Sequence, residues 1–112
     1  MSRNRLSEAK RLVLKIGSAL LVDDQAGRIR RDWLDALADD VAECRRAGQE
    51  VVIVTSGAIA AGKRLLGLTG ALRLEEKQAA AAAGQVRLAH AYQEAMARHE
   101  ITAGQVLVTL GD

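Results

Sequence analysis

The sequence predicts an α/β protein with a mainly parallel sheet, because short apolar segments alternate with longer segments of helical periodicity. Three segments have the composition of strands, at residues 11–16, 51–55 and 105–110. Each is separated from the next by more than the dozen or so residues that a crossover connection needs. Such crossovers join parallel strands, and they are almost always right-handed.

A turn and a loop are expected directly after the first strand. Gly17 and Ser18 follow residues 11–16 as a turn. Residues 20–29 include two aspartates and a glycine, a composition typical of a loop or a small hairpin.

A helix is expected over residues 31–47, followed by a buried strand. Apolar side chains recur there on one helical face, at Leu34, Leu37, Val41 and Cys44. Gly48 stands where a C-terminal cap belongs. Residues 51–55 are consecutively apolar up to a threonine, which predicts a parallel strand buried on both faces.

Two more helices are expected, over residues 58–66 and 74–98, with a loop at residues 67–73 between them. The second helix is rich in alanine at residues 79–83, which favours close packing against a neighbouring element. Gly84 is a point at which this helix could be interrupted.

Composition excludes several classes of protein. The chain has 112 residues, 16 basic and 14 acidic, so its net charge of +2 gives no basis for a nucleic-acid tail or a polybasic membrane patch. One cysteine excludes an internal disulfide and a multi-cysteine zinc site. No apolar run is long enough to cross a bilayer, and aromatic residues for stacking on bases are almost lacking. We therefore expect a cytoplasmic protein without membrane or nucleic-acid partners.

Three parallel strands make a poor independent domain. Parallel sheets normally have both faces covered, and a terminal apolar strand would leave an aggregation-prone edge. We therefore expect residues 1–10 to form a tail and residues 11–112 to be the N-terminal part of a larger α/β domain.

Lys15, Gly17 and Ser18 form the first candidate site. A lysine near the carboxyl end of a strand points towards the crevice where open α/β sheets bind ligands, and a glycine lets backbone amides approach an anion. The group could hold a transferring phosphoryl group. The alternative is a lysine at a strand edge that merely reaches solvent, and local sequence leaves the two about equal. A lysine inside an otherwise apolar strand is unusual, which favours the functional interpretation.

Residues 52–62 form the second candidate site. A strand, then Thr55, Ser56 and Gly57, then a helix would place unpaired amides and a hydroxyl at a helix N-terminus, where a carboxylate or phosphate can bind. The alternative is that Ser56 merely caps the helix, and both can hold at once.

Residues 57–63 also match the spacing of a phosphate-binding P-loop. Arg64 follows, however, where a P-loop needs Ser or Thr to hold magnesium. The intervening Ala-Ile-Ala-Ala favours helix over the open loop that cradles phosphates. A P-loop is therefore a remote alternative.

Lys77, Gln78 and Gln85 could face a ligand from the alanine-rich helix. Their spacing alone favours a solvated face, with Gly84 as a close-packing residue. No His, Asp or Glu cluster has metal-ligand spacing, so we expect no metal-binding residues in this segment.

Residues 12–18 resemble the opening of the amino-acid kinase superfamily, and residues 51–62 resemble the signature of its glutamate 5-kinase family. Residues 77–85 and 104–109 continue the resemblance in order, so that it covers nearly the whole chain from Arg11. It implies an αβα sandwich around a mainly parallel sheet. It also implies ATP-dependent phosphorylation of the γ-carboxylate of L-glutamate, the first committed step of proline synthesis, with Mg²⁺ as a cofactor and a homo-oligomeric full-length protein.

The resemblance also implies roles for single residues. Lys15 would contact the nucleotide phosphates and steady the transferred phosphoryl group. The phosphate-side loop would be Gly17 and Ser18, and the glutamate-binding loop would be Ser56, Gly57 and Ala58. Ala19 departs from the family pattern, which often has a second hydroxyl residue there.

The resemblance covers only the glutamate side of the family's domain. The family's later glutamate-binding Asp and Asn, its nucleotide-binding half and its second catalytic lysine have no counterpart up to Asp112. Two alternatives stay open: another kinase of the same superfamily, or a non-catalytic truncated chain that binds a partner through its open sheet edge.

We expect the isolated 112-residue chain to be inactive, because the resemblance places the nucleotide-binding half beyond it. The check is to incubate the purified chain with ATP, Mg²⁺ and L-glutamate and to measure ADP. Glutamate-dependent ADP formation by this chain alone would contradict the expectation.

Overall fold

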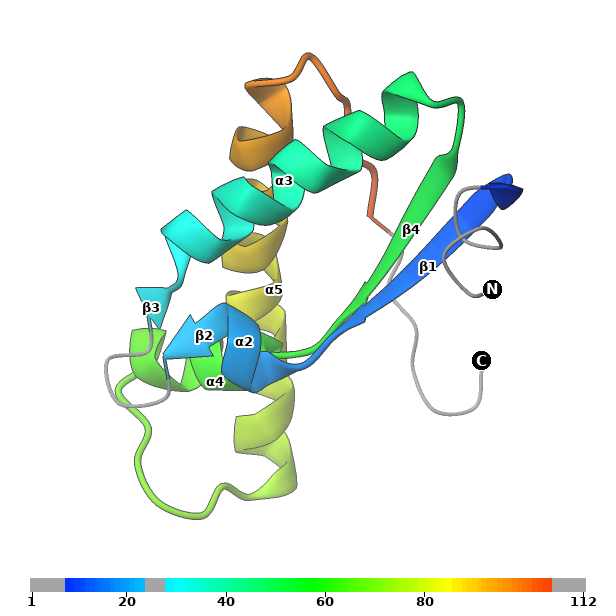
Figure 1. The fold of residues 1–112 in the computed structure, drawn as a ribbon. Helices are drawn as coiled ribbons and strands as arrows, with labels where there is room; N and C mark the ends of the chain where they lie inside the picture. Colours follow the sequence, from blue (N-terminus) through cyan, green and yellow to red (C-terminus); the bar gives the residue numbers. More distant parts are fainter. Residues whose placement is uncertain (1–7, 24–27, 106–112) are drawn as a thin grey trace.

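The computed structural model describes residues 8–23 and 28–105, and it has the α/β character that the sequence predicts (Figure 1). Its strands and helices are interspersed along the chain. In order they are β1 (Arg11–Ile16), α2 (Ser18–Leu21), β2 (Val22–Asp23), β3 (Arg28–Ile29), α3 (Arg31–Arg46), β4 (Glu50–Thr55), α4 (Ala58–Leu65) and α5 (Leu74–Ala97).

The main sheet is the parallel pair β1 and β4, in register from Arg11 opposite Glu50 to Ile16 opposite Thr55. The chain crosses from one strand to the other through α3, as the long connection predicts. The expected small hairpin is confirmed, because β2 and β3 pair antiparallel. The predicted third strand lies outside the described residues, apart from Gln105, which is in neither helix nor strand.

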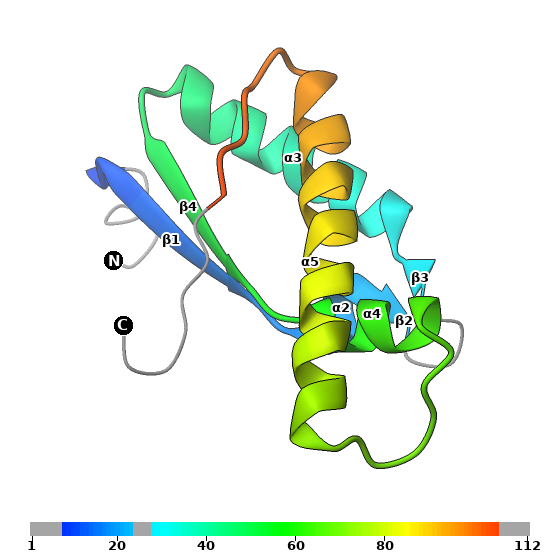
Figure 2. The ribbon, with the colours of Figure 1, turned by 180° about the vertical axis from the view of Figure 1, so that it is seen from behind.

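The expectation that β4 is buried on both faces is wrong for this chain. Along β1 and β4 the side chains alternate between the two faces of the sheet. The covered face packs on α3 and α5, which lie on the same side of the strands (Figure 2). The other face is open, since Val13, Val52 and Val54 are 62%, 44% and 49% exposed and no described helix lies over them.

The helix α3 forms and ends for the reasons that the sequence suggests. Its apolar stripe buries Leu34, Ala38 and Val41 against the core. It ends in a Schellman motif, in which Gly48, at φ +85°, donates to the carbonyl of Arg45 and the next amide donates to Cys44. A left-handed residue costs least when it is glycine, which confirms Gly48 as the cap.

The helices α4 and α5 cross in backbone contact. A Cβ atom built on Gly62 would lie 1.7 Å from the carbonyl oxygen of Ala80, and one on Gly84 would lie 1.8 Å from that of Ala58. The close packing expected for the alanine-rich segment is therefore confirmed. The possible interruption at Gly84 is not found, because α5 runs unbroken through it, and its packing explains the glycine. No described helix has the length and apolar character needed to cross a membrane.

We expect Gly62→Ala and Gly84→Ala each to lower the free energy of unfolding by about 1–3 kcal/mol or more, because the added methyl meets backbone atoms. In α5 this loss must exceed the gain of about 1 kcal/mol that alanine brings to a helix interior. Urea unfolding measures both effects. Gly104→Ala is the matched control, since nothing lies within 4 Å of its Cβ position. Equal stability of all three variants would contradict the backbone contact.

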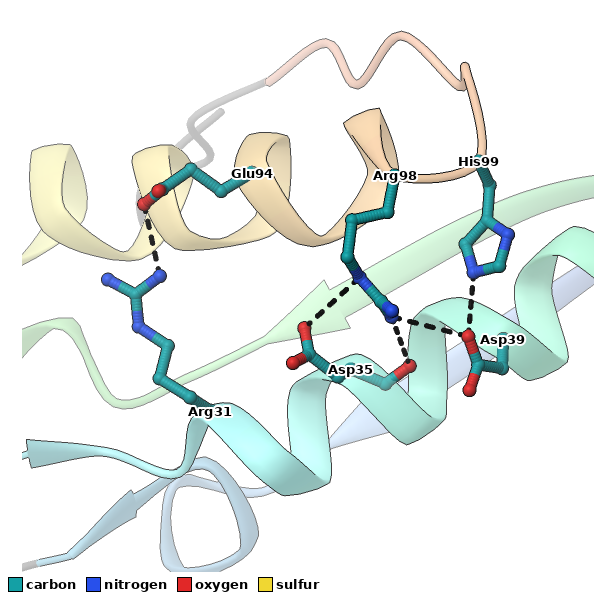
Figure 3. A network of polar contacts seen from close by, with 6 residues as sticks. All are labelled: Arg31, Asp35, Asp39, Glu94, Arg98 and His99. Carbon is teal, nitrogen blue, oxygen red and sulfur yellow. Dashed lines mark hydrogen bonds and ion pairs between the residues drawn. The ribbon is translucent and has the colours of Figure 1, made fainter.

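Charged side chains also join α3 to α5 (Figure 3). Arg31 donates to Glu94 at 3.0 Å, and Arg98 donates to Asp39 at 3.2 Å. His99 lies 2.7 Å from the same Asp39 oxygen. The hydrogen bond to His99 and the neighbouring Arg98 lower the pKa of Asp39, and the hydrogen bond from Arg31 lowers the pKa of Glu94. The pairs are exposed, so each contributes little by itself.

These lowered pKa values predict acid sensitivity. The stabilisation is complete above the ordinary values of 3.8 for Asp39 and 4.5 for Glu94, and it is lost as the pH falls through the lower folded values. We expect the urea midpoint to fall from pH 6 to pH 3, and to fall less in Asp39→Asn/Glu94→Gln. Asp40→Asn, whose carboxylate makes none of these contacts, should keep the full acid response. An unchanged response in the double variant would exclude this source of acid sensitivity.

Candidate functional site

The two candidate motifs meet at the carboxyl ends of β1 and β4. Lys15 and Ile16 lie opposite Val54 and Thr55. Because the strands are parallel, the segments that follow β1 and β4 leave the sheet at the same end. The amide of Ser56 donates to the carbonyl of Ile16 at 3.3 Å, which extends the pairing one step beyond the strands. Residues about forty positions apart in sequence are thus brought together.

Lys15 lies on the open face of the sheet, with Val13 and Val54. Its side chain is exposed, and its ammonium group makes no ion pair with a carboxylate of the described residues. The structure therefore places a positive charge next to the strand ends, where it is available to an anionic ligand. The same exposed position also fits a lysine that merely reaches solvent.

Gly17 leaves room for a ligand at the end of β1. Apart from Gly17 itself and its two chain neighbours, no described atom lies within 4 Å of its Cβ position, and its carbonyl accepts a hydrogen bond of 3.2 Å from Leu20 in the short α2 helix. Ser18 is the first residue of that helix. The backbone at Gly17 is therefore open in the way that close approach of a phosphate requires.

Ser56 does not cap α4. The N-cap is Gly57, at φ +113°, and no side chain makes a capping hydrogen bond there. A residue with a side chain is strained at this angle, so glycine is required for the chain to turn from β4 into α4. Ala58 begins the helix, and its carbonyl packs against Gly84. Ser56 is exposed, and its hydroxyl makes no hydrogen bond within residues 8–23 and 28–105, so it remains available to a ligand.

A pocket of about 950 Å³ opens beside this helix start. Its wall includes all three candidates of the second motif together with Lys63 and Arg64, and none of its described residues carries a carboxylate. Lys15 and Gly17 of the first motif are not among the described residues of this wall. The remaining lining comes from α4, the following loop and α5, at Ile59, Ala60, Leu68, Thr69, Gly70 and Ala81. A wall with two cationic side chains and a helix N-terminus suits an anionic ligand.

The structure rejects a P-loop at residues 57–63. Residues from Ala58 onward form α4 and not an open loop. Lys63 lies in the last turn, and its Nζ atom donates to the carbonyl of Gly70 at 2.8 Å. The lysine therefore holds the loop between α4 and α5, away from the amides at the helix start.

A polar connection between α5 and the site was not predicted from the sequence. The hydroxyl of Tyr92 donates to Oγ1 of Thr55 at 3.3 Å, and Oγ1 of Thr55 donates to the carbonyl of Ser56 at 3.2 Å. Tyr92 is only 9% exposed, and burial raises its pKa, partly offset by the hydrogen bond to Thr55. The available signal was a tyrosine on the apolar face of α5, since a buried tyrosine needs a hydrogen-bond partner.

The remaining candidates from the sequence are the polar residues of α5 and possible metal ligands. Lys77 and Gln78 are exposed on the first turns of α5, which agrees with a solvated face. Within the described residues no three His, Cys, Asp or Glu side chains lie together as metal ligands.

Comparison with known proteins defines the class of protein to which this arrangement belongs. The amino acid kinase family matches residues 10–112, and the chain belongs to this family. Within it, the chain is 63% identical over 107 residues to glutamate 5-kinase of Paramagnetospirillum magneticum, an alignment that covers 96% of this chain. It is also 63% identical to glutamate 5-kinase of Dinoroseobacter shibae and 54% identical to that of Agrobacterium fabrum, over 96% and 100% of its length. The chain spans about 29% of the length of each of these relatives.

Proposed function

We propose that the complete protein transfers a phosphoryl group from ATP to the γ-carboxylate of L-glutamate, the first step of proline synthesis. The observation that carries the proposal is the meeting of Lys15 and Gly17 with Ser56 and Gly57 at the carboxyl ends of two parallel strands, beside a pocket whose described lining has no carboxylate. The similarity to glutamate 5-kinases supports the choice of substrate. In this proposal the chain is the glutamate-side part of a longer kinase domain.

Lys15 would act by neutralising charge. A carboxylate that approaches a nucleotide phosphate is repelled by it, and an ammonium group between them reduces this repulsion most when charge spreads in the transition state. Gly17 and Ser18 would hold the phosphate side, because the open backbone at Gly17 lets amides approach oxygen atoms closely. These residues fit a nucleotide phosphate, and ATP supplies the phosphoryl group when it is bound.

Ser56 and the start of α4 would orient the glutamate. The hydroxyl of Ser56 donates a hydrogen bond to a carboxylate, while the amides of Gly57 and Ala58 offer the positive end of the helix dipole. Three donors from consecutive residues fix direction as well as position, which brings the acceptor oxygen near the phosphoryl group. The rest of the nucleotide site and the homo-oligomeric contacts would belong to the complete protein.

One other role has a specific observation in its favour. The open face of the sheet, with Val13, Val52 and Val54, could be covered by a separate chain, in which case this segment would be a non-catalytic partner. The two roles differ in their dependence on Lys15, which only catalysis requires. A third hypothesis is that the complete protein is a different kinase of the superfamily. In that case carbamate or a nucleoside monophosphate should compete with glutamate in the complete protein.

We expect Lys15→Met in the complete protein to lower kcat for glutamate-dependent ADP formation by about 10²–10³-fold, the usual effect of removing one electrostatic donor. Lys10→Met is the matched control, because Lys10 stands at the opposite end of β1, where its carbonyl accepts from Glu50. Steady-state kinetics with varied ATP and glutamate give the result.

Lys63→Ala serves as a second comparison in the same assay. It should retain nucleotide binding, because Lys63 contacts the loop at Gly70. Loss of nucleotide binding in Lys63→Ala together with full activity in Lys15→Met would overturn the assignment of Lys15.

A further inference from the structure

The hydrogen bonds from Tyr92 to Thr55 and from Thr55 to the Ser56 carbonyl form a chain that starts on α5 and ends in the candidate site. A threonine hydroxyl has one proton, so when it donates to a carbonyl it can only accept from the tyrosine. The direction of the chain is therefore fixed. Burial of Tyr92 raises the pKa of its phenol, which keeps the donor protonated at neutral pH.

The carbonyl at the end of this chain belongs to the same rigid unit as the Gly57 amide. The peptide bond is planar and trans, so the C=O of Ser56 and the N–H of Gly57 point in opposite directions in one plane. A bond that fixes the oxygen therefore also fixes the direction of the N–H. Gly57 itself, at φ +113°, is the residue with the fewest steric limits on rotating this plane.

The residues on either side of the Ser56–Gly57 peptide are held by hydrogen bonds, but those bonds leave the plane of the peptide free to tilt. On one side it follows Ser56, whose amide is held by Ile16 at 3.3 Å. On the other side it enters α4, whose hydrogen bonding begins with Ala61 donating to the Gly57 carbonyl at 3.0 Å. Neither bond involves the carbonyl of Ser56 or the amide of Gly57. The contact from Thr55 is thus the one described interaction that sets the tilt of this plane.

We propose that Tyr92 and Thr55 are positioning residues that aim the Gly57 amide at the substrate carboxylate. The inference rests on the proposed function, because the amide needs a carboxylate to bind. The hydrogen bonds from Tyr92 through Thr55 reach the site from the covered face of the sheet, whereas Lys15 reaches it from the open face. Tyr92 and Thr55 would therefore affect binding of the amino acid and leave the phosphate side alone.

The experiment is steady-state kinetics on the complete protein with three single variants. Tyr92→Phe removes only the first donor, and we expect the KM for glutamate to rise about fivefold while the KM for ATP stays within about twofold. Thr55→Val removes both bonds and should raise the glutamate KM by about tenfold or more. Thr55→Ser keeps the hydroxyl and should return the glutamate KM to within about twofold of the wild-type value. Gln93→Ala, an exposed neighbour on α5, is the control for general effects on that helix.

A double variant separates a connected chain from two unrelated contacts. If the bonds act in series, Tyr92→Phe/Thr55→Val should have the same glutamate KM as Thr55→Val alone within about twofold. A merely structural role would instead lower the thermal midpoint and shift both KM values together.

The outcomes distinguish this inference from the proposed function. Activity of the wild-type protein with unchanged glutamate KM in Tyr92→Phe and Thr55→Val would overturn the positioning role and leave the function standing. Multiplicative effects in the double variant, or equal effects on ATP and glutamate, would also overturn it. No glutamate-dependent ADP formation by the wild-type protein would overturn both.

Discussion

The parallel pairing of β1 and β4 is the interaction on which the candidate site depends. Antiparallel strands would send their carboxyl ends to opposite edges, and Lys15 would then lie far from Ser56. The pairing in turn depends on α3, which carries the chain back along the sheet. The helix ends at Arg46, and the turn at Gly48 leads directly into β4 in register with β1. The left-handed turn at Gly48 thus helps to bring together Lys15 and Ser56, which lie about forty positions apart in the sequence.

The sequence carries enough information for β1, β4, the three longer helices and the two motifs, but not for α2, which begins where the sequence predicts a turn. Helical periodicity predicts α3 and its cap, and strand composition followed by glycine identifies Gly17 and Gly57. The covered and open faces of the sheet could not be predicted, because consecutive valines look the same whether or not a layer lies over them. Gly84 was ambiguous for a similar reason, since a glycine that breaks a helix and one that admits a neighbour have the same local sequence.

The connection from Tyr92 to Ser56 shows a different limit. Tyr92 lies on the buried face of α5, and Thr55 is the last residue of β4. Their meeting depends on how α5 lies against the sheet, and the close backbone contact of α4 and α5 at Gly62 and Gly84 helps to hold α5 there. Periodicity and local motifs do not predict how helices pack against each other, so a hydrogen bond that depends on this packing can be found only from the structure.

The crossing of α4 and α5 also restricts how this sequence can change over time. The atoms that exclude a side chain at Gly62 and Gly84 are carbonyl groups of Ala80 and Ala58, which every amino acid possesses. A side-chain clash can be relieved by a smaller neighbour, but a clash with backbone cannot be relieved by any substitution at the opposing position. The two glycines are therefore positions without compensating partners, and covariation between them and the residues they touch should be absent among homologous sequences.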